Sequence, residues 1–187
     1  MSADKKISDE AILNSIIKFA LSHNYYPTFR EIGDLVGLTS TSSVHSRLKS
    51  MEKKGLLTCN AQSPRCMNVP GLMYKKYNTE NRNKDSPSTN SFIKDKGTKT
   101  RRQIYDAIEE YMLKNNVSPS VREICAMTGK NSTSTIKAQL DIMKERKMLD
   151  FNENSPRTLK LPGIMLIFNP INNKSVVTSI EPDKISK

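Results

Sequence analysis

Apolar residues recur at helical spacing in the first part of the chain. Residues 8–23 are predicted to form a helix that begins at an N-cap, Ser8, and carries Ile12, Ile16, Phe19 and Ala20 at helical spacing. A short second helix is expected after Pro27 and is ended by Gly37, with Ile32, Leu35 and Val36 turned inward. A Ser/Thr cluster then opens a third helix, whose buried face carries Val44, Leu48 and Met51.

Two short strands are predicted after the third helix. They lie at Leu56–Thr58 and Met67–Val69, on either side of a polar turn. A helix, a second helix, a turn, a third helix and a two-stranded wing are the elements of a winged helix-turn-helix.

The whole pattern occurs twice. Residues 12–73 align without a gap on residues 104–165, and 22 of the 62 aligned positions are identical. Chance would give about four, at roughly 6% per position. The second copy again has apolar residues at helical spacing, namely Ile104, Ala107, Ile108, Tyr111 and Met112. The predicted fold class is therefore mainly α with small β wings, built as two tandem winged helix-turn-helix domains joined by a flexible linker.

Composition places the boundaries of these domains. We expect a first domain over 1–73, a flexible basic linker over 74–99, a second domain over 100–168 and a tail over 169–187. The linker is rich in Lys, Asn, Ser and Thr and almost lacks apolar residues, which is typical of a chain that cannot form a core. The segment IMLIF (164–168) is left open, as a further strand or as a contact surface.

The charge favours a polyanionic partner. The 187 residues include 30 Lys and Arg against 19 Asp and Glu, which gives a net charge of +11. Such an excess indicates nucleic acid ahead of a membrane. It is shared by both copies and the linker, with +3 over 1–71, +4 over 72–99, +3 over 100–163 and +1 over 164–187. No apolar run approaches the roughly 20 residues that span a bilayer. The first residues lack a long apolar stretch and a small-residue cleavage site, so we do not expect secretion.

Catalysis and cofactor binding are not indicated. The sequence shows no paired carboxylates, Ser/His/Asp set, phosphate-binding loop or metal cluster, so we expect neither an enzyme nor a cofactor. His45 has no second ligand three or four residues away, which argues against metal binding. Cys59, Cys66 and Cys125 form no CxxC pair, and structural roles are favoured over redox sensing or zinc binding. We expect Cys125 to be buried in a helix.

Two segments resemble the DNA-binding domain of the LexA repressors. The first is PTFREIGDLVGLTSTSSVHSRLKSMEKKGLL (27–57), and the more diverged second is PSVREICAMTGKNSTSTIKAQLDIMKERKML (119–149). Both contain the P-[TS]-x-R-E-I element, the following glycine, the Ser/Thr-rich helix start and, further on, Ser-Pro-Arg. The resemblance covers about two-thirds of the chain and implies a cytoplasmic, nucleoid-associated bacterial protein that binds double-stranded DNA.

LexA repressors also carry a C-terminal domain with an Ala-Gly cleavage site and a Ser/Lys dyad. Only 24 residues follow residue 163, and the sequence has no Ala-Gly pair. We therefore expect the DNA-binding fold without the self-cleavage domain, its dimerisation surface or the SOS response.

The resemblance points to the third helix of each copy as the recognition helix, whose first turns face the major groove. In copy one the positions that face bases or nearby phosphates are Ser40, Ser42, Ser43, His45, Ser46 and Arg47. In copy two they are Ser132, Ser134, Thr135, Lys137, Ala138 and Gln139. The alternative is that the hydroxyls only cap helices and face solvent. Because three of the six positions differ in chemistry, we expect unequal half-sites, in an imperfect palindrome or a direct repeat.

Four further arginines are candidates. Arg65 and Arg157 in the wings are interpreted either as minor-groove or backbone contacts or as ordinary exposed turn residues. Arg30 and Arg122, each followed by Glu, are expected to touch phosphate or to pair with a carboxylate.

Two lobes in one chain replace dimerisation by effective concentration. A linker of about 26 residues spans roughly 25–30 Å, close to the ~34 Å between half-sites one turn apart. We therefore predict a sequence-specific repressor of a phage or mobile element that acts as a covalent pseudo-dimer. The alternative is an inhibitor or adaptor that binds a protein, for example an antagonist of host defence, which the apolar Ile142 and Met143 would suit. A homodimer with four lobes on DNA is also open.

Overall fold

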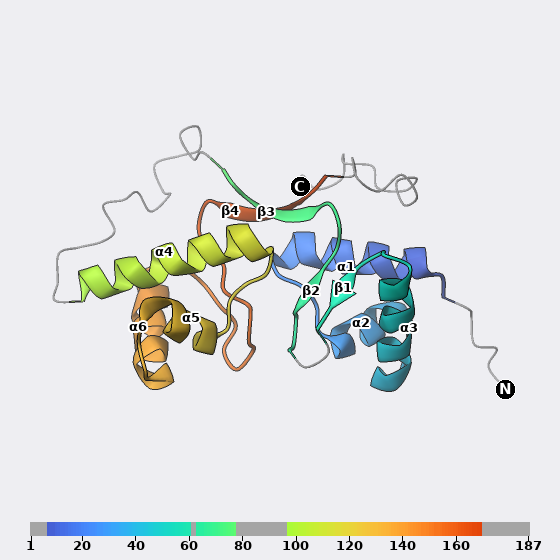
Figure 1. The fold of residues 1–187 in the computed structure, drawn as a ribbon, viewed down its shortest axis with the longest axis horizontal. Coiled ribbons are helices and arrows are strands. Elements are labelled where there is room, and N and C mark those ends of the chain that lie inside the picture. Colours follow the sequence, from blue (N-terminus) through green and yellow to red (C-terminus); the bar gives the residue numbers. More distant parts are fainter. Residues whose placement is uncertain (1–6, 61–62, 78–96, 170–187) are drawn as a thin grey trace.

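The computed structural model describes residues 7–60, 63–77 and 97–169, so that most of the predicted linker and tail lie outside the described residues. The first lobe (7–77) contains α1 (Asp9–His23), α2 (Phe29–Val36), α3 (Thr41–Lys53), β1 (Thr58–Cys59), β2 (Met67–Asn68) and β3 (Leu72–Lys76). The second lobe (97–169) contains α4 (Thr98–Asn115), α5 (Val121–Thr128), α6 (Thr133–Glu145) and β4 (Ile164–Phe168). The predicted fold class is confirmed (Figure 1).

The second helix of each lobe begins at a capping box. The Thr28 hydroxyl accepts a hydrogen bond from the Glu31 amide at 3.2 Å, and the Glu31 carboxylate accepts one from the Thr28 amide at 2.6 Å. Ser120 and Glu123 repeat the arrangement at 3.4 Å and 2.7 Å. These bonds satisfy amides that a helix start leaves unpaired. The recurring P-[TS]-x-R-E-I element is thus first of all a helix start.

Two sequence predictions need correction. Leu35 is 49% exposed instead of inward, because the eight-residue α2 buries only Ile32 and Gly33 against α1 and α3. The wings are also shorter than predicted. β1 and β2 pair over two residues each, and the second lobe has a single bridge between Asp150 and Lys160 at the equivalent positions.

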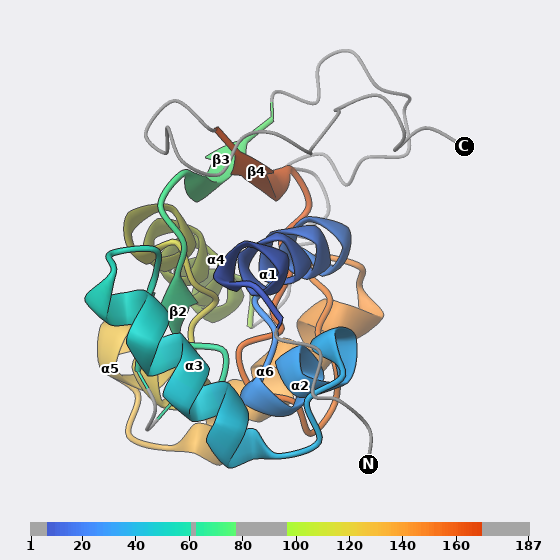
Figure 2. The same ribbon diagram turned by 90° about the vertical axis from the view of Figure 1, so that its right-hand side faces the viewer.

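One hydrophobic core runs through both lobes. It joins the inner faces of the three helices of each lobe to the residues of β3 and β4 that point inward. Figures 1 and 2 show the resulting layers, with β3–β4 at the top, α1 and α4 beneath it, and the pairs α2–α3 and α5–α6 below. None of the helices in the described ranges combines the length and apolar character needed to cross a bilayer.

The lobes share a two-stranded antiparallel sheet, which the sequence analysis did not predict. Tyr74 of β3 lies opposite Leu166 of β4, and the flanking pairs are Leu72 with Phe168 and Lys76 with Ile164. Since equivalent residues of the two copies are 92 positions apart, exchanging the lobes maps this register onto itself. The described lobes are therefore related by an approximate two-fold axis at the Tyr74–Leu166 pair.

An asparagine of each lobe binds the strand of the other. Asn24 accepts a hydrogen bond from the Leu166 amide at 2.7 Å and donates one to the Ile164 carbonyl at 2.9 Å. Its equivalent, Asn116, accepts one from the Tyr74 amide at 3.1 Å. Both asparagines end a helix with positive φ, 62° and 54°, a conformation that Asn tolerates better than most residues. The helix ends of each lobe thus fix the strand of its neighbour.

We expect Leu166→Ala to lower the free energy of unfolding by about 2–5 kcal/mol, because it leaves a cavity under the shared sheet. Met165→Ala is the matched control, since Met165 lies on the same strand with a 50% exposed side chain, and should change stability by less than about 0.5 kcal/mol. Urea denaturation measures both. Equal losses would show that the inner face of the sheet is not a core.

Candidate nucleic-acid interface

The two helix-turn-helix units lie on the same side of the molecule. Figure 1 shows α2–α3 and α5–α6 at opposite ends of that side, away from β3–β4, and the turned view in Figure 2 agrees. Helices α3 and α6 occupy equivalent positions in the two lobes, as expected from the two-fold relation. The arrangement leaves the two recognition helices facing away from the shared sheet.

The first turns of α3 present hydroxyl groups to solvent. Val44, Leu48 and Met51 are buried, whereas the predicted contacts Ser40, Ser42, Ser43 and Ser46 are exposed. The Ser40 side chain makes no capping hydrogen bond. Ser40 therefore does not act as a side-chain cap, and the exposure of these serines fits both the predicted DNA contact and a solvent-facing role.

The first turns of α6 are equally exposed but chemically different. The exposed residues are Ser132, Ser134, Thr135, Lys137 and Ala138. Here the N-cap hydroxyl of Ser132 does accept a hydrogen bond from the Thr135 amide, at 3.3 Å. Hydroxyls and one lysine beside the positive end of a helix dipole form a surface suited to an anion or to polar base edges.

Position 47 and its equivalent, 139, face their own first helix. The Arg47 guanidinium lies 3.5 Å from the Asp9 carboxylate and donates to the Ile7 carbonyl. Gln139 accepts a hydrogen bond from Arg101 at 3.3 Å. Both side chains are half-buried, so contact of Arg47 with DNA, which stays a prediction, requires release from Asp9.

His45 and the two arginines of the second helices have simpler surroundings. The His45 ring is half-buried, 5.8 Å from the Phe29 ring. Arg30 and Arg122 are exposed, and neither makes a hydrogen bond or ion pair within the described ranges. The expected ion pair of Arg30 or Arg122 with a carboxylate is therefore not found among the described residues, and contact with phosphate stays a prediction. Across the same ranges, no three or more His, Cys, Asp or Glu side chains gather as a metal site would require.

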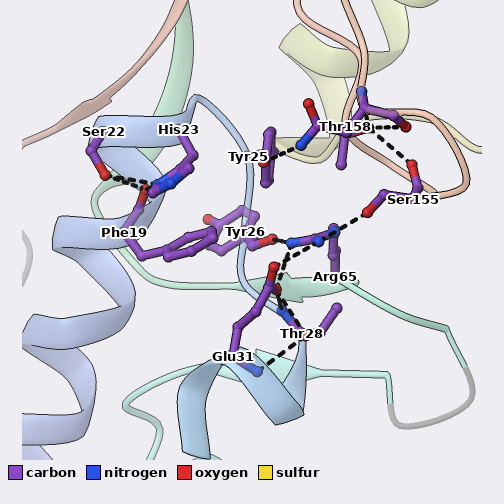
Figure 3. Close-up of polar contacts among 11 residues, drawn as sticks. Phe19, Ser22, His23, Tyr25, Tyr26, Thr28, Glu31, Arg65, Ser155 and Thr158 are labelled. Carbon is purple, nitrogen blue, oxygen red and sulfur yellow. Dashed lines mark hydrogen bonds and ion pairs between the residues drawn. The ribbon is translucent and has the colours of Figure 1, made fainter. Parts of the chain in front are cut away.

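The wing arginines do not lie on the exposed surface. Arg65 is 5% and Arg157 is 8% exposed, so neither the DNA contact nor the exposed turn residue is correct. Arg65 binds both carboxylate oxygens of Glu31, at 2.8 and 2.9 Å, and donates to the Tyr26 carbonyl at 2.9 Å (Figure 3). The bidentate pair links the wing to the start of α2.

The second lobe repeats this pair. Arg157 binds the Glu123 carboxylate at 2.9 and 3.0 Å and donates to the Ser118 carbonyl at 3.1 Å. The only sign of these ion pairs in the sequence was that the Glu of the capping box and the Arg of the Ser-Pro-Arg turn recur together in both copies. No sequence pattern, however, says which Glu an Arg 34 residues further on will bind.

Each buried arginine also reaches the other lobe. Arg65 donates to the Ser155 hydroxyl at 3.0 Å, and Arg157 donates to the Ser63 hydroxyl at 3.2 Å. Since Ser63 and Ser155 are equivalent positions, the contact is reciprocal. We call these four residues the arginine clasp. It binds the two wings to each other between the helix-turn-helix units.

Tyr25 adds a contact that has no counterpart in the second lobe, where Val117 stands. Its hydroxyl accepts a hydrogen bond from the Asn152 amide group at 2.7 Å. The Arg65 guanidinium lies 4.8 Å and the Lys160 ammonium 5.3 Å from its ring centroid. The Tyr25 ring therefore contacts the clasp arginine of its own lobe and a lysine of the other lobe, and this cation–π reinforcement exists on one side only.

The cysteines occupy positions that fit structural roles. Cys125 is buried, as predicted, and Cys59 and Cys66 are half-buried. Burial raises the pKa of the Cys59 thiol, and the nearby Glu52 carboxylate raises it further. Because the thiolate is the reactive form, this environment disfavours redox sensing by Cys59.

The carboxylates that pair with the clasp arginines, those of Glu31 and Glu123, are held ionised. Burial raises the pKa of Glu123, but hydrogen bonds from Tyr111, Ser120 and Arg157 outweigh it and lower the pKa to about 2. In Glu31, bonds from Arg65 and Thr28 likewise outweigh burial and lower the pKa.

A lowered carboxylate pKa stabilises the fold above the unfolded value of 4.5, and this stabilisation disappears as the pH falls towards about 2. We expect Glu123→Gln to be less stable than the unmodified protein at pH 7, with the gap closing between pH about 4.5 and about 2. Glu110→Gln, on the exposed surface of α4, should leave the profile unchanged. Urea unfolding across this pH range measures it, and a gap that stays constant would contradict the role of Glu123.

Comparison with known proteins agrees with this geometry. The model of the LexA DNA binding domain matches residues 8–66 and 95–158, about two-thirds of the chain. The LexA repressor of Mycobacterium tuberculosis is 45% identical over 73 residues, which are 38% of this chain and 31% of the repressor. The LexA repressor of Mycolicibacterium paratuberculosis is 49% identical over 61 residues, 33% of this chain and 26% of that protein.

LexA repressor 2 of Nocardia farcinica is 43% identical over 70 residues, 37% of this chain and 29% of the repressor. The chain thus spans less than a third of the length of these curated relatives. No solved structure matches it significantly. The matched segments cover the three helices of each lobe and the first part of each wing, and the chain belongs to the LexA DNA-binding domain family.

Proposed function

We propose that the protein is a sequence-specific repressor that binds double-stranded DNA with both lobes, as a covalent pseudo-dimer. The observation that carries the proposal is the two-fold relation of the lobes, with both recognition helices facing away from the shared sheet. A dimeric helix-turn-helix protein uses the same symmetry to place two helices in successive turns of one groove. Here one chain supplies both halves.

The symmetry favours one of the two target types that the sequence left open. Lobes related by a two-fold axis match half-sites in inverted orientation, whereas a direct repeat needs lobes related by translation. The half-sites differ in sequence because His45 and Ser46 of the first recognition helix are replaced by Lys137 and Ala138 in the second. The preferred site is thus an imperfect inverted repeat.

Direct contact between the lobes bears on spacing as well. The shared sheet and the arginine clasp fix the lobes against each other, so the length of the segment between them does not set the span. A pseudo-dimer with fixed lobes binds half-sites at a single separation. Repression follows by occlusion of a promoter, and the proposal retains the phage or mobile-element setting, in which compact regulators are common.

One feature that would suit the protein-binding alternative is an apolar surface at Ile142 and Met143. Met143 is fully buried in the core and Ile142 is half-buried. This pair therefore contributes little to an exposed apolar surface, and the alternative becomes an outcome of the following test.

Selection of bound fragments from random DNA should yield two unequal motifs in inverted orientation at one spacing. The variant S42A/S46A/S134A/K137A, which removes only exposed side chains of the recognition helices, should lose at least about 100-fold in affinity for the selected site at about 0.2 M salt.

The control is K18A/K114A, which removes two exposed charges of α1 and α4 and should change affinity by less than about threefold. Selection of no DNA, or full binding by the quadruple variant, would overturn the proposal in favour of a protein partner. One motif without its inverted mate would overturn the pseudo-dimer.

A further inference from the structure

The outward faces of the two recognition helices carry opposite charges. In α3, the side opposite the buried Val44, Leu48 and Met51 bears Lys49 and Lys53. In α6, the equivalent positions are Asp141 and Glu145. The fold is the same, but two cations in one lobe have become two anions in the other.

These four charges face solvent. All four residues are exposed, and none makes a hydrogen bond or an ion pair inside the described ranges. The neighbouring position behaves differently, although its charge is also exchanged. Glu52 accepts a hydrogen bond from the Cys59 amide at 3.0 Å, and Lys144 donates one to the Phe151 carbonyl at 2.7 Å. Glu52 and Lys144 thus each bind the wing of their own lobe. The four outward-facing charges have no bonding partner among the described residues.

In the proposed DNA complex, the first turns of the recognition helix enter the groove and the outward charges lie beside the DNA backbone. Duplex DNA carries one negative charge per ~1.7 Å of its axis, and each lysine at a phosphate releases a counterion. A carboxylate at the same place repels phosphate within the Debye length of about 8–10 Å. The later turns of α3 are therefore suited to the rims of the groove, and those of α6 are not.

We propose that the two lobes bind DNA unequally, with Lys49 and Lys53 strengthening the hold of the first lobe and Asp141 and Glu145 weakening that of the second. The inference rests on the proposed DNA binding. The first lobe provides most of the affinity, and the second lobe discriminates among neighbouring sequences once it is held beside the DNA. The operator then has one strong and one weak half-site, and changes in the strong half are the more damaging.

The direct test is the double variant D141K/E145K, measured on the selected operator as affinity against salt concentration. We expect an increase in affinity of at least about tenfold at about 0.15 M salt, with a salt dependence steeper by about two counterions. The neutral variant D141N/E145Q should have an affinity between that of the unmodified protein and that of D141K/E145K. The reverse change, K49D/K53E, should lose at least about tenfold.

A matched control separates this local effect from the overall charge. D106K/E110K makes the same change in net charge on exposed positions of α4, and the ion pair that it removes, Asp106 with Arg102, is exposed and contributes little. It should alter affinity by less than about threefold.

An unchanged or lowered affinity of both D141K/E145K and D141N/E145Q would overturn the inference, and so would an equal gain in D106K/E110K. Failure of the unmodified protein to bind any selected DNA would instead overturn the proposed function, so the two failures are distinguishable.

Discussion

The pairing of β3 with β4 determines where every other feature of the molecule lies. Because the register is centred on Tyr74 and Leu166, equivalent residues of the two copies, one lobe is turned about a two-fold axis relative to the other. A shift of one residue would turn the buried Tyr74 and Leu166 to solvent and break this relation. The orientation of the recognition helices thus depends on a strand pair on the opposite side of the molecule.

The arginine clasp extends the same symmetry towards the interface. Each arginine of the clasp is buried and pairs with a half-buried carboxylate of its own lobe, and removing the carboxylate would leave an uncompensated buried charge. Arg65 and Arg157 each bind a carboxylate and a carbonyl of their own lobe and a serine of the other. Among the described residues, the buried Nε of Arg65 is left without a hydrogen-bond partner. Folding of each wing is consequently coupled to docking of the lobes.

Sequence reasoning predicted the repeated elements well and the contacts between copies poorly. Apolar spacing, Gly37 and the capping residues are local signals, and they located six helices among the described residues. Arg65 and Arg157 were placed on the surface because a turn arginine is usually exposed, and only the three-dimensional fold brings Glu31 and Glu123 beside them. The strand at 164–168 could be suggested from IMLIF. Its pairing with 72–76, the equivalent segment of the first copy, could not. Charge exchange on α6 was visible in the sequence, yet its meaning required the burial pattern of the helix.

The central claim is that the described lobes form one symmetric unit before DNA arrives. Spin labels on K18C and E110C, equivalent exposed positions of α1 and α4 away from the recognition helices, with C59S, C66S and C125A to remove the natural thiols, would report the separation of the two lobes by pulsed electron paramagnetic resonance. A single narrow distance distribution without DNA, unchanged in width when the operator is added, is the predicted result. A broad distribution that narrows only on binding DNA would contradict the account.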